Sequence, residues 1–201
     1  MEKKILITCF EPFGGESFNA SMAVAEAMPV KLAGADVEKV TLPVEFGRAA
    51  VIAREKAKET GASLVICFGE ARSRKAVTPE LLAINLAHAS IPDNAGNLPH
   101  DEIISENGET AYFTDFPARN LAEAIKKQGV ASLLSYSAGA YVCNDLYYRL
   151  LYSFNGSGTR VLFIHVPRLD IDGGYAAMAN AVALALSSII CEEPGDENVK
   201  K

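Results

Sequence analysis

Three apolar runs constrain the fold more than any other feature of this 201-residue sequence. They are KILITCF at residues 4–10, LVICF at 64–68 and VLFIHV at 161–166, and all three are rich in β-branched or aromatic residues. Continuous apolar runs of this length predict strands buried on both faces, because a half-exposed strand alternates apolar with polar residues. The sequence therefore predicts a sheet that is covered on both sides.

Helical segments separate these runs along the chain. Apolar spacing, together with helix start and stop signals, predicts helices at residues 19–28, 46–60, 116–128, 141–151 and 173–191. Further strands are predicted at 37–44, 81–89 and 130–136, and a long surface loop rich in Pro, Asn, Asp and Gly at 91–107. Strands that alternate with helices predict a three-layer α/β/α fold around a mostly parallel, mixed and twisted sheet.

The length and the even organisation of the sequence predict a single domain. A chain of 201 residues has the usual size of one domain, and it can bury a core without disulfides or a structural metal. No repeat, low-complexity tract or long linker divides it. We therefore expect one domain over residues 1–201, with a frayed, charged tail at 192–201.

The charge of the chain excludes one class of partner. There are 19 Lys and Arg against 25 Asp and Glu, which gives a net charge of −6, and no basic run is longer than a pair. A surface that binds nucleic acid needs clustered basic residues. We therefore expect no nucleic-acid partner.

Two apolar segments bear on the location of the protein. Residues 173–191 carry no charge, but they are rich in alanine and include Asn180 and Ser187. They predict a helix packed on the sheet rather than a membrane span. The N-terminal run at 5–10 is too short for the apolar part of a signal peptide. We therefore expect a cytoplasmic protein that binds no membrane.

The cysteines predict neither a disulfide framework nor a metal centre. No two of the four are spaced as C-x-x-C, and the three histidines are also isolated from one another. Cys9 and Cys67 lie inside apolar runs, where a thiol acts as a small hydrophobe. Cys191 lies at the end of the last predicted helix, where the helix dipole disfavours a thiolate.

Cys143 is the cysteine whose position favours chemistry. It follows the small-residue turn SAGAYV and falls in the first turn of the predicted helix 141–151. The positive end of a helix dipole lowers the pKa of a thiol, and free backbone N–H groups there can stabilise an oxyanion. The alternative interpretation is a cysteine that only packs in the core.

His165 lies at the carboxyl end of the predicted strand 161–166. In open α/β sheets the ligand crevice lies beyond the carboxyl ends of the strands, so we expect Cys143 and His165 at the same sheet edge. A histidine in that place can take the proton of a thiol. The alternative is a core histidine that bonds to the backbone.

A third group should orient the imidazole of His165. Glu70 comes just after the run at 64–68, and Glu80 precedes the predicted strand 81–89, so either glutamate qualifies. Asp170 and Asp172 are further candidates, although they resemble solvated loop acids. The residues alone do not choose among them.

The loop after the first strand carries Phe10, Phe13 and a Gly-Gly pair at 14–15. It has neither G-x-G-x-x-G nor the Lys-Ser/Thr of a P-loop, so phosphate binding is weakly supported. Two phenylalanines on a loop at the ligand edge favour a flat apolar ligand instead. The alternative is that they only pack the loop against the core.

Several separated motifs occur in the order known for one family. They are ILITCFEPFGGESFNAS, VTPELLAINLAHASIPDNAGN, SYSAGAYVCNDLYY and FIHVP. From Lys4 to about Ile190, the chain resembles the type I pyroglutamyl peptidases, or pyrrolidone-carboxylate peptidases, which are cysteine peptidases of α/β/α fold. The same architecture is shared with phosphorylases.

The resemblance implies a function and a set of site residues. Cys143 would be the nucleophile, His165 the general base and Glu80 the group that orients it. The implied pocket for the pyroglutamyl ring consists of Phe10, Phe13, Asn19, Glu70, Ile91, Tyr141 and Val142. The substrates would be peptides with an N-terminal pyroglutamyl residue, cleaved through a thioacyl-enzyme by a single catalytic domain. Family members are typically homotetramers that need no metal or cofactor.

The sequence departs from the common family pattern in three places. Many bacterial members read GQAGGR where residues 69–74 read GEARSR, so Glu70 replaces a glutamine. An arginine often follows the catalytic glutamate, but here it is Leu81; and DARIPDN has become HASIPDN, which puts Ser90 in place of an arginine. Two alternatives follow: a binding protein of altered or no activity on this scaffold, and a phosphate- or nucleoside-binding enzyme.

Overall fold

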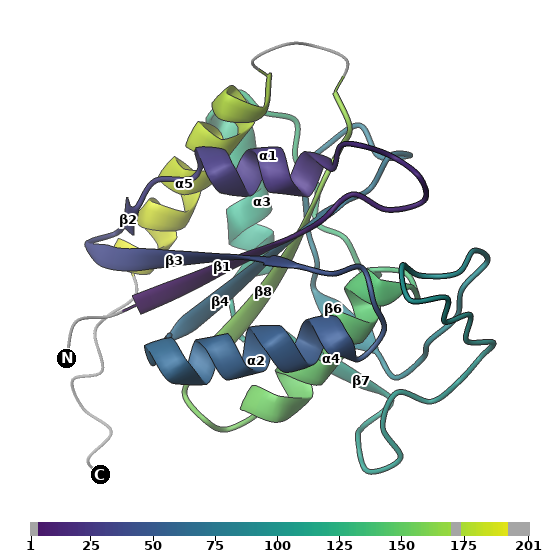
Figure 1. The fold of residues 1–201 in the computed structure, drawn as a ribbon. Coiled ribbons are helices and arrows are strands. Elements are labelled where there is room, and N and C mark those ends of the chain that lie inside the picture. The colour runs from purple at the N-terminus through teal and green to yellow at the C-terminus, as the bar shows by residue number, and fades with distance from the viewer. Residues whose placement is uncertain (1–3, 170–173, 193–201) are drawn as a thin grey trace, which may run out of the picture.

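A six-stranded sheet runs through the middle of the molecule, with helices on both faces (Figure 1). The structure is a computed structural model that describes residues 4–169 and 174–192. The strands follow the spatial order β2-β3-β1-β4-β8-β5. Their bounds are Lys31–Leu32 (β2), Ala35–Leu42 (β3), Lys4–Phe10 (β1), Leu64–Glu70 (β4), Arg160–Val166 (β8) and Thr78–Pro79 (β5). The four central strands are parallel and the two edge strands antiparallel, which confirms the predicted fold class.

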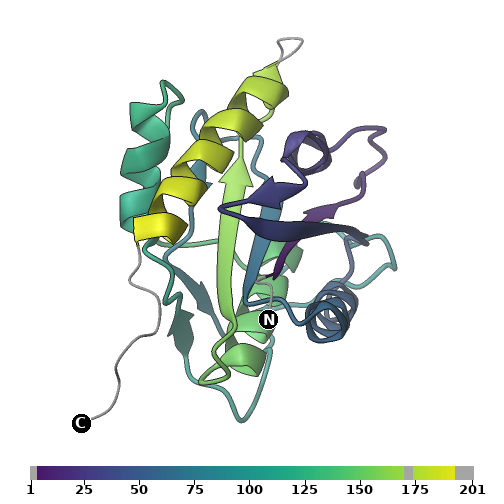
Figure 2. The ribbon, with the colours of Figure 1, turned by 90° about the vertical axis from the view of Figure 1, so that its left-hand side faces the viewer.

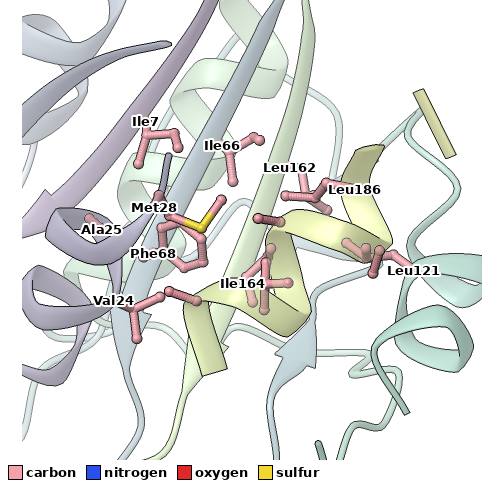
Figure 3. Close-up of a cluster of buried hydrophobic side chains, with 14 of the residues drawn as sticks. Ile7, Val24, Ala25, Met28, Ile66, Phe68, Leu121, Leu162, Ile164 and Leu186 are labelled. Carbon is pink, nitrogen blue, oxygen red and sulfur yellow. The ribbon is translucent and has the colours of Figure 1, made fainter. Parts of the chain in front are cut away.

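Two helical layers cover the sheet. Their helices are α1 (Ala20–Ala27), α2 (Arg48–Thr60), α3 (Ala118–Lys127), α4 (Val142–Phe154) and α5 (Gly174–Glu192). Helices α1, α3 and α5 lie on one face, and α2 and α4 on the other (Figure 1). Figure 3 shows the first layer, where Ile7, Ile66 and Ile164 of the strands meet Val24 of α1 and Leu186 of α5.

Helix α5 is the apolar segment that was expected to pack on the sheet. Its length and mean hydropathy of 1.6 would suffice for a membrane span. It lies beside α3 (Figure 2) and also packs against α1, and Val182 and Leu186 on its inner face are fully buried. The helix is therefore part of the core layer. Gly173, where it was expected to begin, lies outside the described residues.

Two predicted strands differ in the structure. The strand expected at 81–89 is shortened to β6 (Leu82–Ile84), which pairs with β7 (Ala111–Phe113) in a separate two-stranded sheet. The segment 130–136 forms no strand in the described chain, only isolated bridges at Ser132 and Ser135. Its partner β5 is two residues long and contains Pro79, and proline has no N–H to donate to a ladder.

The carboxyl ends of the central strands meet at one edge of the sheet. Phe10 closes β1, Glu70 closes β4, and His165 is the second-last residue of β8. Gly69 and His165 are direct neighbours in the β4–β8 register. The candidate residues at the ends of separate strands are thereby brought to one place. Of the other predicted features, Asp170, Asp172 and the tail beyond Glu192 lie outside the described residues.

Candidate active site

A histidine and a glutamate are joined at this edge of the sheet. His165 Nδ1 lies 2.7 Å from Glu80 Oε1. The antiparallel pairing of β5 with β8 sets Thr78 opposite His165, and the backbone N–H of Glu80 donates to Phe163 O at 2.8 Å. A carboxylate can only accept a hydrogen bond, so Nδ1 carries the proton and Nε2 is left as the basic nitrogen. Of the two candidate glutamates, the structure brings Glu80 to the imidazole.

Cys143 reaches the same place from α4. A Cβ atom added to Gly69 would lie 3.0 Å from Cys143 Sγ and 2.8 Å from Phe163 Cζ. The ring of Phe163 also packs on His165, with 4.8 Å between the ring centroids. Since Gly69 pairs with His165 in the sheet, the sulfur lies over the strand ends that carry the histidine. Gly69 is the residue that leaves room for it.

Burial is the main influence on the charge state of the Cys143 thiol. Cys143 is half-buried as a residue, and the enclosure of its side chain raises the pKa of the thiol to about 12, with the charge of Glu80 adding to the rise. Arg74 acts in the opposite direction. The expectation of a lowered pKa at the helix start is therefore wrong for the resting state, because desolvation disfavours the thiolate.

The imidazole is also kept uncharged. Burial lowers the pKa of His165, the contact with Glu80 raises it, and the charge of Arg74 lowers it again, with a net decrease. The ordinary pKa of histidine is about 6.5, so His165 is neutral at neutral pH. The resting site thus holds a neutral thiol and a neutral base.

The N-terminus of α4 offers free backbone N–H groups beside the sulfur. Its N-cap residue is Tyr141, and no side chain in the described structure caps the helix there. The first N–H groups of a helix have no partner within the helix, and they attract anions. Those of Val142 and Cys143 are therefore suited to an oxyanion formed next to the sulfur.

A small cavity opens beside Cys143. Its volume is about 50 Å³, and it is lined by Phe10, Phe13, Asn19, Val44, Glu70, Tyr141, Val142 and Cys143. Every predicted pocket residue is among them except Ile91, which is 47% exposed. The residue after it does reach the site, because the Tyr141 hydroxyl donates to Pro92 O at 3.1 Å.

Aromatic contacts hold the wall of this cavity. Tyr141 lies between two phenylalanine rings, with centroids 6.4 Å from Phe13 and 5.3 Å from Phe46 in an edge-to-face arrangement. Edge-to-face pairs add to the stability gained from burial alone. Phe46 lies outside the cavity and supports Tyr141 from behind, a role that the sequence did not indicate.

A profile of the pyroglutamyl peptidase family matches residues 3–185 of the sequence. The chain belongs to this family. It is 37% identical over 209 residues to a pyrrolidone-carboxylate peptidase of Streptococcus suis, a match that covers 98% of this chain and 97% of the relative. It is 40% identical over 168 residues to one of Enterococcus faecalis, covering 83% and 79%. The crystal structure of pyroglutamyl peptidase I from Bacillus amyloliquefaciens superposes with a TM-score of 0.85 at 36% identity, covering 93% and 96%.

Glu70, the first departure from the common family pattern, is a paired carboxylate in the pocket wall. Its side chain is fully buried, and Oε2 accepts a hydrogen bond from Ala20 N at 2.6 Å, at the start of α1. Oε1 accepts from Arg72 Nε at 2.7 Å. Both oxygens are therefore occupied by the protein, and the charge has a partner close in sequence.

Ion pairs continue from Glu70 to the mouth of the pocket. Arg72 also binds Glu16 at 2.9 Å, and Glu16 binds Arg168 at 3.2 Å. The guanidinium of Arg72 lies over the ring of Phe13, 5.6 Å from its centroid. The network therefore ties the loop that carries Phe13 to the ends of β4 and β8.

The other two departures lie near the site without lining the cavity. Leu81 uses its backbone, whose N–H donates to Ser135 O at 2.8 Å and whose carbonyl accepts from Thr114 N at 3.0 Å. Ser90 is exposed. In residues 4–169 and 174–192, no group of three or more His, Cys, Asp or Glu side chains could hold a metal ion.

Two buried contacts of this family member were missed by sequence reasoning. Asn144, the residue after Cys143, bonds through its amide to the backbone of Ile84 and Leu86 at 2.9 to 3.0 Å, and so fixes the start of α4 against β6. Arg74 Nη1 lies 2.5 Å from Glu80 Oε1. The backbone partners of Asn144 are distant from it in sequence, so no local pattern indicated these bonds. For Arg74 there was a signal, because the family pattern GQAGGR ends in an arginine at this position.

Proposed function

We propose that this protein is a pyroglutamyl peptidase, a cysteine-type hydrolase that removes an N-terminal pyroglutamyl residue from peptides. The observation that carries the proposal is that Cys143 and the hydrogen-bonded His165–Glu80 pair lie at the same edge of the sheet, around Gly69 and beside a small, largely apolar cavity. Membership of the pyroglutamyl peptidase family supports it. In this proposal Cys143 is the nucleophile, His165 the general base and Glu80 the residue that orients the imidazole.

The cavity suits a pyrrolidone ring. The ring is small, flat and uncharged, and it offers one amide N–H and one carbonyl. A pocket walled by Phe10, Phe13, Val44 and Tyr141 would bury its apolar carbons, while a few polar groups fix its orientation. Because the carboxylate of Glu70 is occupied by Ala20 N and Arg72, we propose that the backbone at this position, and not its side chain, binds the lactam.

The proposed reaction starts from a resting site in which the Cys143 thiol and His165 Nδ1 carry protons and His165 Nε2 does not. His165 Nε2 takes the proton from Cys143 as the sulfur attacks the pyroglutamyl carbonyl carbon, and the carbonyl π electrons move to the oxygen. The N–H groups at the start of α4 hold that oxyanion. When the tetrahedral intermediate collapses, the C–N bond breaks and the imidazolium gives its proton to the departing peptide amine. Water, deprotonated by His165, then cleaves the thioester and restores the thiol.

The raised pKa of Cys143 makes the base essential. A thiol whose pKa is raised by burial is mostly protonated at neutral pH, so in this proposal His165 removes the proton during the attack. The negative charge appears only during attack, and it moves at once onto an oxygen that has hydrogen-bond donors. Glu80 stabilises the imidazolium formed in the same step.

Turnover of a fluorogenic pyroglutamyl amide, measured beside its prolyl analogue, tests the proposal directly. We expect release of the fluorophore from the pyroglutamyl amide alone, because only the lactam carries the ring carbonyl that the pocket would bind. Cys143→Ala should abolish turnover, and Cys191→Ser, at an exposed site, should leave it unchanged. Equal cleavage of both amides, or activity in Cys143→Ala, would contradict the assignment.

A covalent probe locates the nucleophile independently. Cys191 is exposed, so a simple alkylating agent would modify it first; the experiment therefore uses the Cys191→Ser variant and a pyroglutamyl chloromethyl ketone. Mass spectrometry should find the probe on Cys143, with Cys9 and Cys67 unmodified because both are buried. An excess of 2-pyrrolidone should slow the labelling. If 2-pyrrolidone did not slow the labelling, the proposal that the ring binds in the cavity beside Cys143 would be contradicted.

We further propose that the protein works in the cytoplasm as a homotetramer of single-domain chains. Its four cysteines are unpaired in the structure, which suits a reducing compartment. Leu98 and Ile103 on the 91–107 loop are 43% and 66% exposed, and exposed apolar groups of this kind favour contacts between subunits. Light scattering during size-exclusion chromatography should give the mass of four chains; the mass of one chain would contradict the proposal.

A further inference from the structure

The guanidinium of Arg74 touches three residues on two separate segments, one at β5 and one before α4. Nη1 lies 2.5 Å from Glu80 Oε1 and also contacts Thr78 Oγ1, and Nη2 donates to Ser137 O at 2.9 Å. Arg74 itself belongs to the connection between β4 and β5. We propose that Arg74 is a positioning residue of the catalytic site: it holds the Glu80 carboxylate against His165 and fixes both to the loop that leads into the nucleophile helix. The inference rests on the proposed function.

Glu80 needs a positive partner that a neutral histidine cannot supply. Its side chain has no exposed surface, and a buried carboxylate without a counter-charge is strongly destabilising. In the resting site His165 is neutral, so the charge of Arg74 is the one that balances Glu80. Both partners use Oε1, and Oε2 has no hydrogen-bond partner among the described residues. The position of this single oxygen therefore depends on Arg74 as well as on His165.

The second arm of Arg74 reaches the approach to the nucleophile. Ser137 lies on the segment that follows the bridge between Glu80 and Ser135 and that leads to Tyr141, the N-cap of α4. A planar guanidinium can bind Glu80 and Ser137 O at the same time through two different nitrogens. A lysine ammonium is a single point charge and does not present this fork. Arg74 therefore joins the base side of the site to the helix that carries the sulfur.

The charges that face the reacting pair are few. For both His165 and Cys143 they are Glu80 and Arg74. Cys67 and the neighbouring Tyr147, whose hydroxyl donates to Glu80 O at 3.0 Å, are uncharged because burial raises the pKa of each. Arg74 is thus the positive group whose removal changes the proton affinity of the pair.

The direction of that change is fixed by the sign of the charge. Arg74 lowers the pKa of His165, so loss of its charge allows His165 to take up a proton at higher pH. Activity requires the unprotonated base, so the acid limb of the pH profile moves upward when Arg74 is neutralised.

The experiment compares Arg74→Gln, Arg74→Lys and the control Lys75→Gln in pyroglutamyl amide turnover across pH. Lys75 is the adjacent, exposed cation. We expect Arg74→Gln to lower kcat about a hundredfold with KM nearly unchanged, and to raise the acid limb by about one pH unit. Arg74→Lys keeps the charge, so its acid limb should stay near that of the wild type while kcat falls about tenfold. Lys75→Gln should match the wild type.

The outcomes separate this inference from the proposed function. A wild-type protein that does not cleave the pyroglutamyl amide overturns the function and the inference together. If the wild type is active and Glu80→Gln is not, but Arg74→Gln keeps wild-type kcat or an unmoved acid limb, the inference alone is overturned. Melting curves accompany each variant. Should Arg74→Gln fail to fold, Arg74→Lys decides: an acid limb displaced despite the retained charge, or an unchanged kcat, contradicts the role.

Discussion

Glu70 and Glu80 are two buried carboxylates of the same site with different tasks. The side chains of both are 0% exposed, and each is bound to an arginine close to it in the sequence, Glu70 to Arg72 at 2.7 Å and Glu80 to Arg74 at 2.5 Å. Burial and charge pairing therefore do not distinguish them.

Their second partners do. The remaining oxygen of Glu70 accepts the backbone N–H of Ala20 at 2.6 Å and so holds the start of α1, whereas Glu80 Oε1 also binds His165 Nδ1 at 2.7 Å. A carboxylate that binds a backbone amide stabilises the pocket wall. In the proposed mechanism, a carboxylate that binds the base orients it and stabilises the imidazolium. The difference teaches that a buried acid is assigned by what its partner does, not by its own surroundings.

The substitution Glu80→Gln should have the largest effect on this comparison. A neutral amide does not stabilise the imidazolium charge, and its oxygen accepts only a weak hydrogen bond from His165 Nδ1–H. We therefore expect kcat to fall by about 10⁴-fold, as for the orienting acid of serine peptidases. Steady-state turnover of the pyroglutamyl amide measures it. A larger loss in Glu70→Gln than in Glu80→Gln would reverse the assignment of the two residues.

The substitution Gly69→Ala should have the next largest effect. Gly69 adjoins Glu70 of the pocket wall in sequence and pairs with His165 in the sheet. An added Cβ would meet Cys143 Sγ at 3.0 Å and Phe163 Cζ at 2.8 Å, so the sulfur must move. A displacement of about 1 Å at a reacting atom costs about a hundredfold in rate. A matched control is Ala71→Gly, two residues on, which removes a Cβ outside the cavity lining; it should keep wild-type turnover. Unchanged turnover in Gly69→Ala would show that the sulfur does not need this position.

The substitution Glu70→Gln should change kcat/KM by less than tenfold, which is less than about 1.4 kcal/mol. Glutamine keeps the backbone that we propose binds the lactam, and its carbonyl oxygen can still accept from Ala20 N. Assays against the pyroglutamyl and prolyl amides give the number. A gain of about a hundredfold for the pyroglutamyl amide would mean that the native carboxylate impairs this substrate, and the protein would then favour another one.

Weakening of the ion pairs at the mouth should have the smallest effect. Glu16 links Arg72 and Arg168 over the loop that carries Phe13, and solvent-exposed ion pairs of this kind contribute little to stability and weaken with salt. We expect Glu16→Gln to raise KM two- to threefold, and added salt to raise the wild-type KM similarly. Asp36→Asn, which breaks the exposed pair with Lys31 at the opposite end of the sheet, should leave KM unchanged.

Much of the scaffold could be predicted because it depends on local pattern. The strands at 4–10, 64–70 and 160–166 are buried on both faces, and that alone produces their continuous apolar runs. The same logic placed Cys143 and His165 at one sheet edge, because residues that follow parallel strands gather there. The choice of Glu80 over Glu70 depended on the family resemblance, since each lies at the end of a predicted strand and the residues alone do not choose between them.

The remaining features depend on contacts between segments that are distant in sequence. The segment 130–136 forms isolated bridges in place of the expected strand, because the short strand beside it, β5, contains Pro79, which has no N–H to donate. Pro79 lies far from this segment along the chain. The raised pKa of Cys143 reflects how completely the fold encloses the thiol, which the helix position does not indicate. The reach of Arg74 to Ser137 joins residues 63 positions apart. Sequence motifs identify reacting groups better than they identify what surrounds them.

The uncapped start of α4 limits how stable this protein can become. A Ser, Thr, Asp or Asn at an N-cap stabilises a helix by about 1 kcal/mol through its bond to the N2 or N3 amide, and Tyr141 forgoes that bond. A cap at this place would occupy the amides that we propose bind the oxyanion. Stability and turnover therefore compete for the same backbone atoms. Engineering for heat resistance should leave α4 alone and begin at α3, whose N-cap, Pro117, also has no side-chain hydrogen bond and lies away from the cavity.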